Sequence, residues 1–167
     1  MMVDGTARGK GFRVRAGQEV SMLHAPARSA FKREDWPEVR VVHRQNGYAA
    51  LFKPAGLHTA FLASSREPSL EEGLSGFVPE SGARLLNRLD RLTSGLVLAG
   101  VCPERVAAYH QLQERGEVRK YYLAVCRGRM DLGTTVRQRI DSAGKKKVRV
   151  TREKDPEPLR RTRFEPM

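Results

Sequence analysis

An aspartate between two arginines is the feature of this chain whose residue types most suggest chemistry. Asp90 lies between Arg88 and Arg91 in the polar segment Asn87–Gly95. An opposite charge near a carboxylate favours its ionised form, so we expect Asp90 to be charged. A charged carboxylate on a basic loop is suited to catalysis. The same pattern also fits an ordinary turn that is closed by an Asp–Arg pair.

Two apolar runs must position this loop. Leu85–Leu86 precedes it and Leu96–Ala99 follows it. Short apolar runs of this kind predict buried strands, although periodicity alone leaves a buried helix open. Gly95 permits a tight turn where the chain leaves the loop. We therefore expect Asp90 at the edge of a hydrophobic core.

The other patterns predict an α+β fold with a mixed, mainly antiparallel sheet and flanking helices. Asn46-Gly47 supplies the positive φ angles of a tight hairpin turn, and Ser69 with Glu72 has the spacing of a capping box. Strands are predicted at 39–43, 48–52, 96–101, 118–126, 134–140, 148–152 and 160–164. A short helix is predicted from Ser69 to before Pro79, and a second helix from Pro103 to Gly116.

Composition indicates a globular protein that binds a polyanion. The chain has 167 residues, enough for one domain or a domain with a short appendage, and 40% of them are hydrophobic. Its net charge of +12 and pI near 10.4 favour nucleic acid as the partner. The sequence contains no apolar run that could span a membrane and no signal peptide, so we expect a cytoplasmic protein without a membrane partner.

No metal site is expected from the cysteines and histidines. Cys102 and Cys126 lack metal-ligand spacing and suggest a reducing compartment. His43 and His58 have no cysteine or carboxylate at ligand spacing, so we expect them to be structural or loop residues.

Three sequence blocks carry a resemblance to a known family. Residues 87–98, Asn-Arg-Leu-Asp-Arg-Leu-Thr-Ser-Gly-Leu-Val-Leu, resemble the signature His-Arg-Leu-Asp-x-x-Thr-Ser-Gly-Leu of the RluA-type RNA pseudouridine synthases. Residues 52–58 resemble the upstream Asn-Lys-Pro-x-Gly-Leu element of that family, and residues 120–128 resemble its downstream Lys-x-Tyr-x-Ala strand. The resemblance spans residues 39 to 128 and implies a pseudouridine synthase-like catalytic fold.

The chain departs from the family pattern in two places. Asn87 stands where the family usually has histidine. The element Thr-Gly-Arg-x-His-Gln-Ile-Arg, with which the family normally continues, is not found before Met167. The resemblance therefore covers the front of the catalytic domain, and the activity of the chain at this length is left open.

The resemblance implies roles for three residues. Asp90 would be the catalytic carboxylate, Arg88 would fill the space left by an extruded base, and Tyr122 would stack on the uracil. The sequence leaves open whether Asp90 attacks C1′ of the ribose or acts as a base. The chemistry implied needs no metal and no cofactor. The substrate would be a uridine in ribosomal or transfer RNA.

Basic residues around these blocks are predicted to bind RNA. Three adjacent lysines occupy a predicted hairpin tip, and Lys53 either contacts phosphate or braces the loop. The predicted RNA-binding residues are Arg91, Lys53, Lys120, Lys145, Lys146 and Lys147.

The chain divides into three predicted parts. Residues 1–20 are a basic segment, either a remnant of an S4-like RNA-binding module or a flexible arm. Residues 21–38 are a linker whose Trp36 is expected to pack on the catalytic core, and residues 39–167 are the catalytic domain.

The alternative function is a non-catalytic RNA-binding protein with the same fold. A carboxylate-based nucleotide hydrolase is disfavoured because no second carboxylate stands at a recognisable spacing from Asp90. The oligomeric state is open, with a monomer expected.

Overall fold

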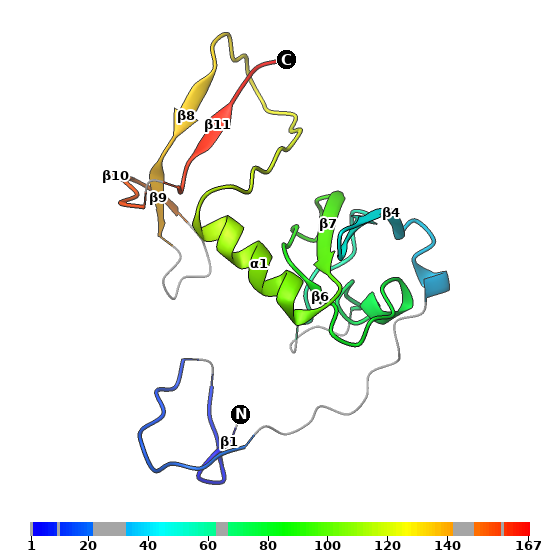
Figure 1. The fold of residues 1–167 in the computed structure, drawn as a ribbon. Coiled ribbons are helices and arrows are strands. Elements are labelled where there is room, and N and C mark those ends of the chain that lie inside the picture. Colours follow the sequence, from blue (N-terminus) through cyan, green and yellow to red (C-terminus); the bar gives the residue numbers. More distant parts are fainter. Residues whose placement is uncertain (1, 10, 22–32, 63–66, 142–148, 158) are drawn as a thin grey trace. The chain divides into compact units, whose positions relative to one another are not determined.

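Two compact units make up the chain, Met1–His110 and Gln111–Met167. The computed structural model describes residues 2–9, 11–21, 33–62, 67–141, 149–157 and 159–167 (Figure 1). The sheet that positions the Asp90 segment belongs to the first unit.

A four-stranded antiparallel sheet is the centre of the first unit. Its order is β4 (Arg40–Gln45), β5 (Tyr48–Lys53), β7 (Gly95–Gly100) and β6 (Arg84–Leu85). The long β5–β7 pairing matches Lys53 with Gly95. The ends of these two strands therefore bring the chain after β5 next to the chain before β7, where Asp90 lies.

The predicted hairpin between β4 and β5 is confirmed. Asn46 has φ 51° and Gly47 has φ 78°, the left-handed values that a tight hairpin turn requires. Gln45 pairs with Tyr48 across the turn, and the register shifts by one residue between Val41 and His43. This bulge locally bends the edge strand β4.

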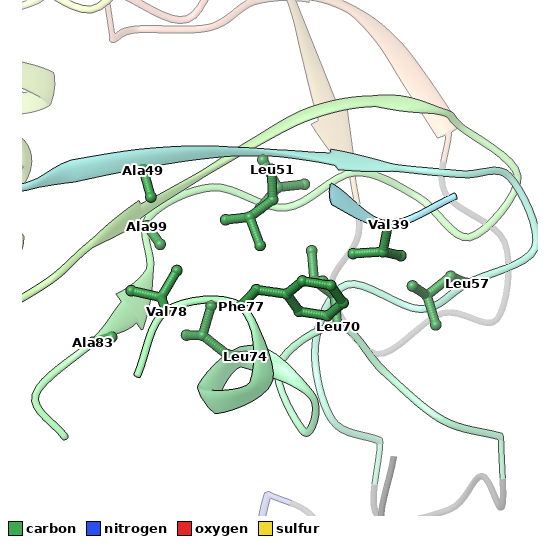
Figure 2. Packing of buried hydrophobic residues seen from close by; sticks show 11 residues of the cluster. Val39, Ala49, Leu51, Leu57, Leu70, Leu74, Phe77, Val78, Ala83 and Ala99 are labelled. Atoms are coloured by element: carbon green, nitrogen blue, oxygen red, sulfur yellow. The ribbon is translucent and has the colours of Figure 1, made fainter. Parts of the chain in front are cut away.

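The core lies on one face of this sheet. Along β5 the buried residues alternate with partly exposed ones, and Ala49 and Leu51 point toward Phe77 and Val78 (Figure 2). Leu96 in β7 is 53% exposed, so the Leu96–Ala99 run is a one-sided strand and not a fully buried one. The buried cluster is Val39, Ala49, Leu51, Leu57, Leu70, Leu74, Phe77, Val78, Ala83, Val97 and Ala99, and Trp36 packs against it as predicted.

The predicted capping box forms, but only part of the short helix predicted after it is helical. The Ser69 amide and hydroxyl donate to Glu72 Oε2 at 3.0 and 2.7 Å, and the Glu72 amide donates to Ser69 Oγ at 3.3 Å. A turn and the 3-10 helix η2 (Leu74–Gly76) follow. Gly73 and Gly76 disfavour continued α-helix, which explains the short element.

The α-helix α1 (Pro103–Glu114) follows β7 as predicted. Gly116, with φ 71°, ends it in the left-handed conformation typical of a helix C-terminus. Gly100 allows close packing, because a Cβ there would lie 3.2 Å from Val106 Cγ2. Flanking helices were predicted; in the part of the chain that the structure describes, α1 is the single α-helix, beside η2 and η1 (Arg33–Asp35).

The second unit contains two pairs of antiparallel strands. β8 (Thr134–Val136) pairs with β11 (Thr162–Phe164), and β9 (Gln138–Asp141) pairs with β10 (Arg149–Lys154). The predicted hairpin is thus confirmed for β9 and β10, whereas the predicted strand 134–140 is divided at Arg137 between two partners.

The predicted strand 118–126 is wrong, because this segment has no regular structure. Its apolar side chains are strongly exposed; Leu123, for example, is 86% exposed. A strand is stable only when its backbone groups pair with a neighbour, and no described strand pairs with these residues. High β propensity alone therefore did not produce a strand here.

The N-terminal residues form a small three-stranded antiparallel sheet. Its order is β2 (Thr6–Ala7), β1 (Met2–Val3) and β3 (Val20–Ser21). Asp4 connects the turn after β1 with the residues before β3, because its carboxylate accepts hydrogen bonds from the Glu19 amide and Gln18 Nε2 at 2.9 and 2.6 Å. Most of the predicted linker 21–38 lies outside the described residues, and the division into a basic segment, a linker and a catalytic domain stays a prediction.

Candidate active site

Asp90 lies exposed on a loop between β6 and β7, here called the Asp90 loop and comprising residues 86–94. Its backbone carbonyl accepts a hydrogen bond from the Thr93 amide at 3.0 Å, which closes a turn. Among the described residues, none forms a hydrogen bond or ion pair with its carboxylate. The carboxylate is therefore available to a ligand.

The residue before Asp90 is held at both of its backbone polar groups, the amide and the carbonyl. The hydroxyl of Thr59 donates to the Leu89 carbonyl at 2.6 Å and accepts from the Leu89 amide at 3.1 Å. Thr59 is 3% exposed, so this pairing is shielded from water. The Leu89 side chain also packs against the core cluster. The backbone that leads into Asp90 is therefore fixed by Thr59 and by the core.

Asn87 fastens the start of the loop to β7. Its Oδ1 accepts a hydrogen bond from the Leu98 amide at 2.7 Å, and its Nδ2 donates to the Leu96 carbonyl at 3.4 Å. The Leu86 amide donates to the Leu98 carbonyl at 2.7 Å. The Asn87 side chain thus continues the β6–β7 pairing beyond the last paired residue of β6.

Arg91 is turned toward the chain after β5. Its Nε donates to the Gly56 carbonyl at 3.0 Å, and its Nη2 donates to Glu67 Oε1 at 2.7 Å. Its carbonyl accepts from the Gly56 amide at 2.8 Å. These contacts exclude Arg91 from the turn-closing Asp–Arg pair that the sequence left open.

Arg88 is exposed and forms no hydrogen bond or ion pair with a described residue. Its guanidinium group can therefore meet a ligand without first breaking a contact within that part of the protein. The role that the family resemblance implies for Arg88 stays a prediction.

Lys53 supports the loop from inside the core. The side chain is 0% exposed, and its ammonium group donates to the carbonyls of Pro54, Leu57 and Arg91 at 3.0, 2.8 and 3.3 Å. Burial lowers the pKa of Lys53 below its ordinary value, and the negative charge of Asp90 partly offsets this. The charges of Lys53 and Asp90 thus interact favourably.

These contacts favour bracing over phosphate binding as the role of Lys53. The ammonium group points at three backbone carbonyls and has no exposed surface through which it could reach RNA. Sequence reasoning missed three further groups that hold the loop, the Thr59 hydroxyl, the Gly56 backbone and the Glu67 carboxylate. They lie 24 to 35 residues from their partners. Gly56 belongs to the family block 52–58, but nothing local in the sequence shows that these three groups contact the loop.

The other predicted site residues lie in the second unit. Tyr122 is 63% exposed in the irregular segment after α1, and Lys120 is exposed beside it. Lys145, Lys146 and Lys147 lie outside the described residues. A partnership of Tyr122 with Asp90 stays a prediction.

The described residues provide no candidate metal site and no candidate membrane span. They contain no group of three or more histidine, cysteine or acidic side chains that could hold a metal ion. None of their helices is long and apolar enough to cross a membrane.

Comparison with known proteins identifies the family. A search of curated proteins gave no match. The family model described as RNA pseudouridylate synthase matches residues 47–167, a range that contains β5, the Asp90 loop, Tyr122 and the whole second unit. Because this match covers most of the chain, the protein belongs to the RNA pseudouridylate synthase family of isomerases.

Proposed function

We propose that this chain is an RluA-type RNA pseudouridine synthase that acts on a uridine of ribosomal or transfer RNA, with Asp90 as its catalytic carboxylate. The observation that carries the proposal is the contrast within the Asp90 loop. Leu89 and Arg91 are each bound to other parts of the protein, whereas the carboxylate between them is exposed and bonded to no described residue. A fixed backbone with an available reactive group is typical of a catalytic position.

Pseudouridine formation exchanges one bond for another. The N1–C1′ bond of uridine breaks, the uracil turns, and a C5–C1′ bond forms while C5 loses its proton and N1 gains one. Because no electron is gained or lost, the reaction needs no redox partner. A carboxylate can stabilise or attack C1′, as it does in glycoside cleavage.

The target base must leave its stack to reach Asp90, at a cost of a few kcal/mol. Arg88 stands two residues before Asp90 and is exposed. We assign to it the space that the extruded uridine leaves behind. Its cationic side chain also counteracts the negative charge that the RNA backbone brings to the loop.

Tyr122 is proposed to stack on the uracil and to assist proton removal at C5. The exposed side chain is available for such a contact, and aromatic rings stack on bases with a gain of about 1–3 kcal/mol per base. This role follows from the family resemblance of residues 120–128.

RNA binding is proposed to rest on exposed basic residues. Lys120 is exposed, and the net charge of +12 supplies a general attraction to phosphate. Arg91 retains N–H donors that are not used by Gly56 or Glu67 and can add a phosphate contact. Lys145, Lys146 and Lys147 complete the proposed set, and Lys53 is assigned to the support of the loop. A cytoplasmic location accords with these RNA substrates and with the two free cysteines.

Tritium release tests the proposal and separates it from RNA binding without catalysis. Ribosomal and transfer RNA labelled with tritium at C5 of uridine would be incubated with the full chain. The proposal predicts tritium release from at least one RNA. In that RNA, one defined uridine should be converted to pseudouridine. Binding of both RNAs without any release would refute the enzyme and leave the alternative, an RNA-binding protein with the same fold.

A further inference from the structure

The carboxylate of Glu67 bridges two residues from different parts of the site. Its Oε1 accepts a hydrogen bond from Arg91 Nη2 at 2.7 Å, and its Oε2 lies 2.9 Å from His58 Nε2. Each oxygen of the Glu67 carboxylate therefore contacts a different neighbour, Arg91 in the Asp90 loop and His58 in the segment after β5. A carboxylate held at both oxygens has little freedom to rotate.

Arg91 connects Glu67 with the backbone next to Asp90. Its Nε and Nη2 point to two different acceptors, the Gly56 carbonyl and Glu67. Its own carbonyl receives the Gly56 amide at 2.8 Å and Lys53 Nζ at 3.3 Å. The side chain and the backbone of Arg91 are thus both attached to the chain that follows β5.

We propose that Glu67, oriented by His58, is a positioning residue that fixes Asp90 through Arg91. The kinetic part of this inference rests on the proposed function, whereas its structural part concerns the free protein. The combination of His58, Glu67 and Arg91 is named the clamp. With the clamp closed, the backbone of Asp90 is placed between two attached neighbours, Leu89 and Arg91.

A competing role for Glu67 is to neutralise an arginine that would otherwise grip phosphate. The geometry favours positioning, because the planar guanidinium group is held by acceptors in two directions and not by the carboxylate alone. A lysine at position 91 would keep the charge but could not reproduce this fork. The two roles therefore separate in the variants Glu67→Gln and Arg91→Lys.

Amide hydrogen exchange by NMR tests the clamp without RNA. Three amides report on it, those of Gly56, Leu89 and Thr93, each of which donates to the loop or lies within it. Glu67→Gln should raise their exchange rates by about tenfold, because a weakened clamp lowers the free energy of local opening. The Leu51 amide in the middle of β5 should exchange as in the wild type. Unchanged exchange at all three amides would overturn the clamp.

Steady-state kinetics test its catalytic consequence. If Glu67 positions Asp90, Glu67→Gln should lower kcat by about tenfold to a hundredfold with little change in KM, because small misplacements of a reacting group are costly. Arg91→Lys should do the same. A lower KM with unchanged kcat in Glu67→Gln would overturn positioning and assign charge neutralisation instead. The charge-matched control is Glu38→Gln, an exposed carboxylate of the first unit that lies outside the clamp.

A double variant tests whether Glu67 acts through Arg91. In the Arg91→Lys background, Glu67→Gln should cause less than about twofold further loss of kcat, because coupled residues are not additive. Full additivity would overturn the route through Arg91. Should the wild type itself fail to isomerise uridine, the exchange rates still decide the clamp, so the failure of the proposed function and the failure of this inference are distinguishable.

Discussion

Lys53 shows most clearly how one residue supports this site. A buried ammonium group is costly unless it is paired and hydrogen-bonded. Lys53 meets three carbonyls and the charge of Asp90, so its burial is compensated by contacts that tie β5 to the Asp90 loop. The sequence left open whether Lys53 contacts phosphate or braces the loop, and its contacts with the three carbonyls favour bracing.

Replacement of Lys53 by methionine should lower the free energy of unfolding. The three carbonyls would lose their donor, and buried acceptors left unsatisfied cost about 1–3 kcal/mol. Urea denaturation of the wild type and Lys53→Met measures the difference. Equal stability of the two proteins would show that the lysine is not buried against these carbonyls.

The same pair of proteins has an expected pH dependence. Burial lowers the pKa of Lys53 in the folded state, so between that lowered value and the ordinary lysine value the unfolded chain binds more protons than the folded one. The unfolding free energy of the wild type relative to Lys53→Met should therefore rise with pH through this window. A fall would contradict the direction of the pKa shift.

Among the elements, those specified by local pattern could be predicted from the sequence. Asn46-Gly47 fixed the β4–β5 hairpin, and Pro103 with Gly116 marked α1, because turn and cap chemistry act within a few residues. The strand expected at 118–126 could not be judged in this way. Whether a segment of high β propensity becomes a strand depends on a partner elsewhere in the chain.

The candidate site also contains some features that the local sequence shows and others that only the fold shows. The pattern around Asp90 was visible because it is continuous in sequence, whereas Thr59 and Glu67 reach the loop only through the fold. Asn87 was noticed as a departure from the family pattern. Its attachment of the loop to β7 became visible only in the structure.

Removal of the Asn87 amide should loosen the connection between the loop and β7. Asn87→Ala loses an acceptor for the Leu98 amide and a donor to the Leu96 carbonyl. We expect a loss of about 1–2 kcal/mol in thermal or urea unfolding, from two net hydrogen-bond contributions. Gln113→Ala, which removes an exposed amide from α1, is the control and should change stability by less than about 0.5 kcal/mol. If both variants unfold alike, Asn87 does not hold the loop.

At the scale of the whole molecule, we expect charge to govern how the protein meets RNA. With 31 basic against 19 acidic residues, the attraction to RNA should be largely electrostatic and sensitive to salt. Specificity must then come from the loop and its neighbours, since a general attraction to phosphate does not distinguish one uridine from another.

Salt titration of RNA binding examines a single contact. Lys120→Ala should reduce the slope of log affinity against log salt by about 0.7 to 0.9, the contribution of one phosphate contact, and should weaken all RNAs alike. Lys120→Arg retains the charge and should keep the slope of the wild type. An unchanged slope in Lys120→Ala would remove this residue from the RNA-binding set.

The central claim is that Asp90 carries out the reaction from a loop that the rest of the protein holds in place. Its most direct test is single-turnover conversion of uridine by Asp90→Asn, with Asp35→Asn as an exposed, isosteric control from the first unit. We predict that Asp90→Asn forms no pseudouridine, binds RNA within about threefold of the wild type and keeps its unfolding midpoint, while Asp35→Asn remains fully active. Pseudouridine formation by Asp90→Asn at the wild-type rate would contradict the account.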